Sequence, residues 1–188
     1  MRLLRTAQLL AAACLFAPLI FLPQTLSSQR SSAPETELSC RKFVQAFYDW
    51  YLKKTLSGKL AAPTPELALK LKPELFSIEL RRRLKQDLDA QSKAEEIVGL
   101  DSDPFLNSQD PSPRFAVVGI TRKGSNYWVD VYGILGSKRQ EHVIPELIQQ
   151  NGHWIFVNFH YGKSKWSDDE NLLTILKNLR AERQKNPQ

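Results

Sequence analysis

The sequence has few of the side chains on which most enzymes depend, with two cysteines and three histidines in 188 residues. It contains no Gly-x-Ser-x-Gly nucleophile elbow, no His-Glu-x-x-His metal pair and no glycine-rich phosphate loop. These absences remove sequence support for serine hydrolases, zinc metalloproteases and nucleotide-binding enzymes. The sequence therefore favours a non-enzymatic protein without a cofactor.

A hydrophobic run long enough to span a bilayer is also missing. The apolar stretch from Leu9 to Leu22 is about 14 residues long, whereas a spanning helix needs about 20. Arg2 and Arg5 precede it and small residues up to Ser27 follow it, which is the layout of a secretory signal peptide. We predict that residues 1–27 are a cleaved leader. The product is then periplasmic or extracellular, and only an uncleaved leader would hold it to the membrane.

The sequence has no strong excess of charge. Its net charge of +6 includes three arginines and no acids among residues 1–30, so the chain beyond residue 30 carries +3. This value is too small to indicate a nucleic-acid partner. Cys40 is the only cysteine beyond the leader, which excludes an internal disulfide. Its apolar neighbours predict a buried packing thiol.

The rest of the chain has the length and the alternating patterns of a single domain. We assign residues 28–38 to a polar linker and residues 39–188 to one domain, which is long enough to bury a substantial core. Apolar residues recur at helical spacing after Cys40, and Thr64 with Pro65 is a typical helix start. A further helix is expected after Pro73, where a run of basic residues from Arg81 to Lys85 is interpreted as a solvated face.

A β pattern follows, with strands predicted over 115–120, 127–135, 141–150 and 153–161. Asn151 and Gly152 favour a tight hairpin turn, and Pro145 suggests an edge strand or a bulge. Residues 167–170 read as a capping box that opens a last helix. The predicted fold is therefore α+β, with N-terminal helices packed on a curved, cone-like antiparallel sheet and a C-terminal helix. Such an arrangement often leaves a pocket between helices and sheet.

The loop between helices and strands combines polar side chains with a central apolar pair, Phe105 and Leu106. We expect this pair to point inward and to hold the polar groups in a defined shape. Calcium binding is the alternative, but Phe105 occupies the place of an EF-hand ligand and no glycine follows it. Asx turns explain the loop better, and no metal is predicted. The polar residues of the loop motif are Asp101, Asp103, Asn107, Gln109 and Asp110.

Three segments together resemble a known family. They are the aromatic helix around Phe47 to Tyr51, the loop over residues 103–110, and the hairpin over residues 152–159. These segments resemble a family of small secreted bacterial domains of the nuclear transport factor 2-like (cystatin-like) superfamily. The resemblance implies the cone-shaped fold and an envelope location, but it implies no reaction.

Aromatic and polar residues in the expected pocket are the candidates for ligand binding. Helix and sheet carry more tyrosine and tryptophan than one core needs, and such residues suit pockets and interfaces. Asp130 and His160 could also form a catalytic acid–base pair if both face inward. The candidate residues are Trp50, Tyr51, Trp128, Asp130 and His160.

From these features we predict an exported, non-enzymatic domain that binds a small ligand or a protein partner in the cell envelope. A pocket enzyme that uses an Asp–His pair is one alternative, and a metal-stabilised structural protein is another.

Overall fold

The computed structural model describes residues 33–57, 64–94, 98–162 and 171–185. The predicted leader, 1–27, and the predicted capping box, 167–170, lie outside these residues. Both therefore stay predictions.

The helices follow the predicted order. They are α1 (Ala33–Thr55), α2 (Thr64–Leu71), the short 3₁₀ helix η1 (Pro73–Leu75), α3 (Ile78–Gln91) and α4 (Leu172–Lys185). The Ser77 side chain caps α3 by accepting a hydrogen bond of 3.2 Å from the Leu80 amide. Because α1 begins at Ala33, the last part of the predicted linker is helical. Pro34 and Glu35, both favourable in a first helical turn, lie just inside this start.

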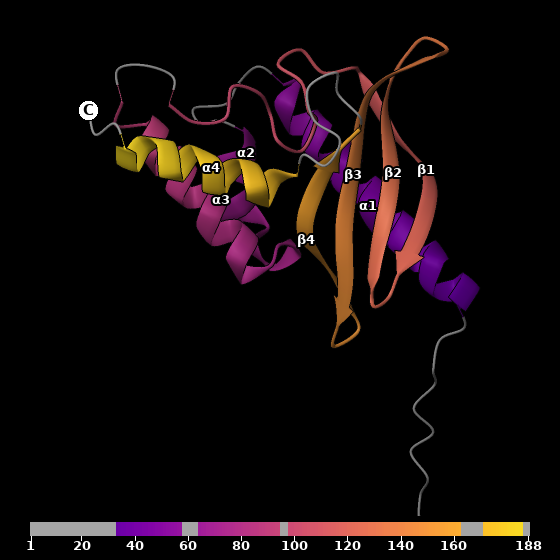
Figure 1. The fold of residues 1–188 in the computed structure, drawn as a ribbon. Helices are drawn as coiled ribbons and strands as arrows, with labels where there is room; N and C mark the ends of the chain where they lie inside the picture. Colours follow the sequence, from indigo (N-terminus) through magenta and orange to yellow (C-terminus); the bar gives the residue numbers. More distant parts are fainter. Residues whose placement is uncertain (1–32, 58–63, 95–97, 163–170, 186–188) are drawn as a thin grey trace, which may run out of the picture. The chain divides into compact units, whose positions relative to one another are not determined.

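Four antiparallel strands form a curved open sheet in the order β1-β2-β3-β4 (Figure 1). The strands are β1 (Arg114–Lys123), β2 (Asn126–Leu135), β3 (Lys138–Gln150) and β4 (His153–Tyr161). The predicted α+β class is thus confirmed.

The turns explain the register of the sheet. Asn151 and Gly152 both have positive φ, 51° and 79°, as a tight hairpin requires, and this prediction is confirmed. Gly136, with φ of 61°, makes a second turn that the sequence pattern did not reveal. As a consequence β3 begins at Lys138, three residues before the predicted start at 141.

Pro145 does not lie on an edge strand, contrary to one of the two predicted possibilities. Its strand, β3, is paired on both sides, with β2 and with β4. The register between β3 and β4 shifts between Glu146 and Leu147, directly beside the proline. Such an irregularity tolerates a residue that cannot donate a ladder hydrogen bond.

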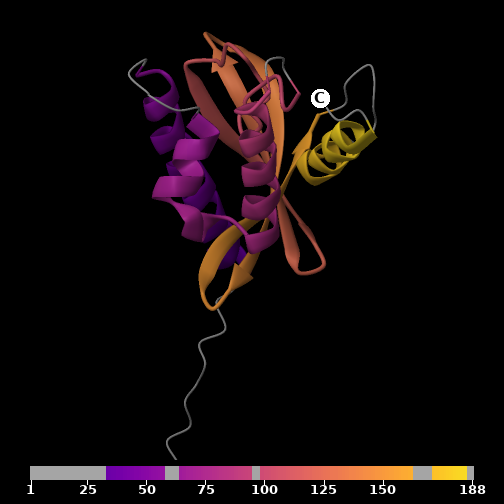
Figure 2. The ribbon, with the colours of Figure 1, turned by 90° about the vertical axis from the view of Figure 1, so that its left-hand side faces the viewer.

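Helices cover the two faces of the sheet unequally. Helix α1 crosses the concave face, and α4 lies on the other side, at the β4 edge, where it packs against β4 and α3 (Figures 1 and 2). Side chains of α1 also hydrogen-bond to backbone groups of the edge strand β1. Arg41 donates to the Val117 carbonyl, and Gln45 bonds to the backbone of Phe115 and Val117. In the part of the chain described, no helix packs across β2 and β3 on the convex side.

Aromatic rings fill the concave side, where a pocket was expected. Phe47 of α1 lies 4.8 Å from Phe156 and 5.8 Å from Phe105 between ring centroids. Phe105 lies 4.9 Å from Phe159 and has no exposed surface. The loop before the sheet therefore inserts a ring into the cone. Cys40 is fully buried in the same core, as predicted, and burial raises the pKa of its thiol to about 12.

Candidate functional site

The predicted site residues divide between the two faces of the sheet. Tyr51 is buried on the concave side, where its hydroxyl donates to Asp103 Oδ2 at 2.7 Å. Trp50 is partly buried on the same helix, and the Lys72 ammonium lies 5.1 Å from its ring. Trp128, Asp130 and His160 lie on the convex side. The five residues therefore do not form one pocket.

A bulge in β4 explains the position of His160. Simple alternation predicts that His160 shares a face with Trp154 and Phe156. The register shifts so that Leu147 faces Phe156 while Glu146 faces Asn158, and one extra residue is inserted between them. This insertion sends Trp154 and Phe156 to the core and His160 to the opposite face.

The alternative in which Asp130 pairs with His160 is not formed, because each of them has another partner. Asp130 Oδ1 lies 3.0 Å from His142 Nε2, and His160 Nε2 lies 2.8 Å from Glu146 Oε2. Each histidine therefore has its own carboxylate, supplied by a strand neighbour on the same face.

Each histidine also stacks on an aromatic ring. The Trp128 and His160 rings lie 3.9 Å apart with an interplanar angle of 24°. The Tyr132 and His142 rings lie 4.1 Å apart and almost parallel, at 4°. We name these two groups the Trp128 unit (Trp128, His160, Glu146) and the Tyr132 unit (Tyr132, His142, Asp130).

The Trp128 unit is the more enclosed of the two. The side chains of His160 and Glu146 are 16% and 15% exposed, against 24% for His142 and 38% for Asp130. Asn126 Nδ2 donates to Glu146 Oε1 and fixes the second oxygen of that carboxylate. Both oxygens of Glu146 and the Nε2 atom of His160 are thus held by neighbours, which restricts the rotamers of these two side chains.

Glycines make room for the Tyr132 unit. A Cβ atom at Gly119 would lie 3.0 Å from Asp130 Oδ2, and one at Gly162 would lie 2.6 Å from His142 Nδ1. A side chain at Gly162 would therefore displace the imidazole. The unit depends on two residues without side chains as well as on its own members.

Exposed cations lie on both aromatic rings of this face. The Lys123 ammonium is 3.3 Å from the Trp128 ring centroid, and the Arg139 guanidinium carbon is 5.0 Å from that of Tyr132. Lys123 is paired with Asn126 at the start of β2, and Arg139 is paired with Ile134 near its end. The two cations therefore lie at opposite ends of this strand. The convex surface therefore has an aromatic centre with a positive charge at each end. We call it the open face, formed by Ile144 and the two units.

A carboxylate that orients a histidine is one half of many acid–base sites. Such a site also needs a nucleophile or a substrate cavity beside the imidazole. Among the residues described, no serine, threonine or cysteine hydrogen-bonds to either ring. The arrangement is chemically suited to holding aromatic and charged groups in place for contact with another molecule.

The predicted loop has the shape expected from its sequence. Phe105 and Leu106 are fully buried, and Asp103 Oδ1 accepts hydrogen bonds from their amides at 2.9 and 3.2 Å. These contacts confirm the inward pair and the Asx turn. Asn107 has a positive φ of 52° and lies at the exposed tip of the loop.

Asp103 is the functional group of the loop most affected by its surroundings. Burial raises the pKa of its carboxyl to about 6. Hydrogen bonds from the Tyr51 hydroxyl and the two amides stabilise the ionised carboxylate and act in the opposite direction, but burial has the larger effect. Asp101 and Asp110 are exposed, and Gln109 Nε2 donates to the Asp101 carbonyl at 2.8 Å. The oxygens of Asp103 therefore serve the loop and the aromatic core. In the described ranges, no group of three or more His, Cys, Asp or Glu side chains could hold a metal ion.

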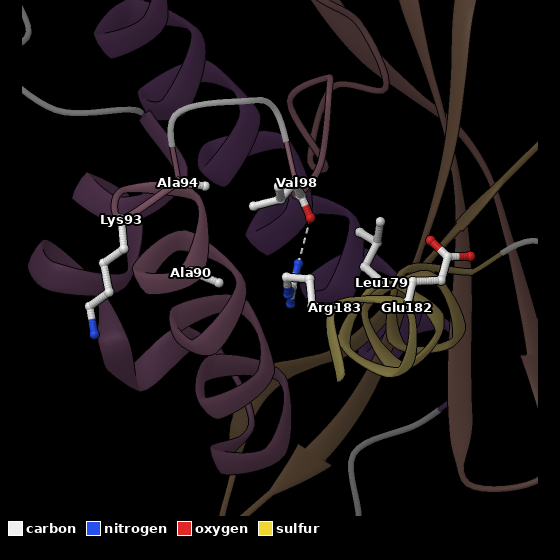
Figure 3. A pocket seen from close by; sticks show the side chains of 7 residues that line it. All are labelled: Ala90, Lys93, Ala94, Val98, Leu179, Glu182 and Arg183. Atoms are coloured by element: carbon white, nitrogen blue, oxygen red, sulfur yellow. Dashed lines mark hydrogen bonds between the residues drawn. The ribbon is translucent and has the colours of Figure 1, made fainter. Parts of the chain in front are cut away.

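A buried ion pair joins the last two helices. Arg183 Nη1 lies 2.7 Å from Asp87 Oδ1, and Asp87 is only 2% exposed. Arg183 also donates to the Val98 carbonyl at 2.7 Å, across a pocket of about 370 Å³ between α3 and α4 (Figure 3). The Leu100 amide donates to the other oxygen of Asp87. This contact fixes α4 against the body of the domain.

The predicted site residues did not include Tyr132, His142 and Glu146 of the open face, nor the two cations at its ends. The Asn151-Gly152 turn predicts that β3 lies beside β4, but only the register shift between Glu146 and Leu147 brings Glu146 and His160 to one face. The unrecognised turn at Gly136 hid the corresponding alignment of β2 with β3, and with it the contact of Tyr132 with His142.

None of the described helices is long and apolar enough to cross a membrane. Comparison with protein families, with curated proteins and with solved structures finds no match to this chain.

Proposed function

We propose that this protein is an exported, non-enzymatic binding domain and that a protein partner in the cell envelope docks on its open face. The observation that carries the proposal is the pair of stacked units on a sheet face that no described helix covers. Half-exposed aromatic rings held by oriented polar groups are the composition of interface centres. The leader-like segment supports the envelope location.

A protein partner fits the fold better than a small ligand in the cone. Phe47, Phe105 and Phe156 occupy the space between α1 and the sheet with ring contacts of 4.8 and 5.8 Å. Two of the predicted ligand residues, Trp50 and Tyr51, belong to that packed side. The remaining three, Trp128, Asp130 and His160, face outward on the convex side of the sheet.

The exposed charges of the open face indicate which kind of partner would fit it. Lys123 and Arg139 are exposed, while Asp130 and Glu146 are already paired with histidines. The complementary surface is therefore an apolar patch flanked by carboxylates. A second copy of this chain is a poorer match, because each rotation that brings the two faces together places cations opposite cations.

The fold also supports a relationship with the nuclear transport factor 2-like superfamily, which we propose from the helix that crosses the concave side of a curved antiparallel sheet. Likeness at the level of the fold supplies no activity.

The experiment is site-specific photo-crosslinking in cells that produce the protein natively. A photoreactive amino acid replaces Ile144, which lies within the open face, or Ile78, which is 77% exposed on α3 and serves as the matched control. We expect one adduct from position 144 and none from position 78. Lys123→Glu together with Arg139→Glu should remove the adduct while leaving the melting temperature unchanged.

Three outcomes would refute the proposed docking. They are equal adducts from both positions, an adduct that survives the charge reversal, and an adduct with twice the mass of this chain, which would assign the face to self-association.

A further inference from the structure

The basic run on α3 contains one member that differs from the others. Arg82 and Arg83 both contact Glu79, at 2.8 and 2.6 Å, and Lys85 contacts Asp89 at 2.8 Å. Arg81 has no such partner within the part of the chain that the structure describes. Among the described residues its Nε is the only buried side-chain nitrogen or oxygen without a hydrogen bond.

An unpaired buried donor needs an explanation, because it lowers stability relative to a paired donor or an apolar side chain. Arg81 is partly buried beside Leu80, which belongs to the core and has no exposed surface. A methionine could make the same aliphatic contacts without an orphaned N–H. The guanidinium therefore costs stability in the isolated chain, and a ligand that pairs with it would account for its presence.

Arg81 lines a groove of about 350 Å³ between α2 and α3. Residues Glu66, Leu69 and Lys70 lie three and four positions apart and share one face of α2. Arg81, Leu88 and Asp89 share the facing side of α3. The two leucines give the groove an apolar lining, and charged groups border it.

The charges of the groove favour an anion that carries one negative charge. Among the described residues, no carboxylate lies within ion-pair distance of Lys70 or Arg81, whereas the charge of Lys85 is compensated by Asp89. Glu66 lies in the same lining and disfavours a ligand of higher negative charge. The excess is close to one positive charge, located around Arg81 and Lys70.

We propose that this groove binds a small organic anion, a carboxylate on a short apolar body, with Arg81 as the anchoring residue. The planar guanidinium matches a carboxylate through two parallel N–H bonds. Arg81 lines the groove, so a carboxylate bound there can accept hydrogen bonds from its guanidinium. The apolar body then lies against Leu69 and Leu88. This site is separate from the open face.

The test uses octanoate as the probe and octanol as its neutral counterpart. Titration calorimetry on the wild type should show one saturable site for octanoate and binding of octanol weaker by roughly tenfold or more. Arg81→Met keeps the aliphatic stem and should weaken octanoate binding by at least roughly tenfold. Arg82→Met, one residue away and on the exposed surface, should bind octanoate like the wild type.

Stability separates a ligand anchor from a structural residue. Arg81→Met should melt at or above the wild-type temperature without ligand, because it removes an unpaired donor. Octanoate should raise the melting temperature of the wild type and of Arg82→Met, but not that of Arg81→Met. If Arg81→Met fails to fold, Arg81→Lys serves in its place, since it keeps the charge and loses the planar fork.

The proposal is overturned if octanoate shows no saturable binding, if octanol binds equally well, or if both Arg81 variants retain the affinity. Failure here leaves docking on the open face untouched, because Lys123→Glu and Arg139→Glu should not alter octanoate binding.

Discussion

The two faces of the sheet use the same kinds of residue for different purposes. On the concave face Phe47, Phe105 and Phe156 pack ring against ring and are removed from water. On the open face Trp128 and Tyr132 stack instead on histidines that carboxylates hold, and they remain half exposed. Aromatic residues thus stabilise the fold on the concave face, whereas on the open face they form a surface whose side chains are already held in place.

This comparison teaches that alternation along a strand does not indicate which set of aromatic residues forms the core. In β2, Val129 and Val131 are fully buried, whereas Trp128 and Tyr132, the larger side chains, face outward. Histidines on β3 and β4 stack on these rings and make the outward position acceptable for them. The effects of substitutions on the two faces should therefore differ: those on the concave face should lower stability, and those on the open face should lower binding.

The largest effect is expected from Phe105→Ala, which removes the ring inserted into the concave face. Phe105 is fully buried and contacts Phe47, Tyr51, Phe76 and Phe159. The free energy of unfolding should fall by about 3–5 kcal/mol in urea titrations. Leu135→Ala, at a side chain that is 57% exposed, should change it by less than about 0.5 kcal/mol. Equal losses in the two variants would mean that the loop does not fill the cone.

The second effect depends on pH and on Asp103. Its pKa is about 6 in the folded protein against 3.8 for an ordinary aspartate, so the folded state keeps its proton to higher pH than the unfolded state. Wild-type stability should therefore fall as pH rises from about 4 to about 6, by on the order of 2 kcal/mol, and should change no further above that range.

Asp103→Asn should lack this loss, because an amide does not ionise. Asp110→Asn, at an exposed position of the same loop, should follow the wild-type profile. Urea midpoints between about pH 4 and pH 8 measure the difference. Parallel curves for the wild type and Asp103→Asn would show that this carboxyl is not buried as described.

A moderate effect is expected at the turn that sets the register of β3 and β4. Gly152 has φ of 79°, and a Cβ atom there would touch nothing within 4 Å, so only the backbone conformation opposes a side chain. Gly152→Val should destabilise the protein by about 1–2 kcal/mol. Gly152→Asn should cost less, because asparagine tolerates this conformation. If valine and asparagine give the same denaturation midpoint, positive φ is not what the turn requires.

The smallest effect on stability is expected on the open face. His142→Gln keeps a donor for Asp130 and removes a ring that is stacked but partly exposed. The free energy of unfolding should change by less than about 1 kcal/mol. The crosslinking yield at position 144 should nevertheless fall. A loss of stability as large as that of Phe105→Ala would assign this face to the core.

Much of the fold could be predicted from local patterns. The helices, the four strands and the Asn151-Gly152 turn follow from periodicity and from residues with special backbone preferences. The inward direction of Phe105 follows from an apolar pair within a polar loop. In each case the signal lies within a few residues of the feature that it predicts.

The candidate site could be predicted only in part, because it depends on contacts between strands. A one-residue bulge beside Val157 reverses the face of His160, and no local pattern reveals it. Glu146 and His142 became partners of predicted residues only once the register was known. Trp128, Asp130 and His160 were identified by type, whereas their pairing required the three-dimensional structure.

The ion pair between Asp87 and Arg183 has a consequence for the order in which the protein matures. Its two members lie 96 positions apart, and Arg183 belongs to the helix that follows the sheet. A nascent chain that has not yet reached α4 would have to enclose the Asp87 carboxylate without its cation, which is strongly unfavourable. We therefore expect the domain to close only after α4 has been synthesised.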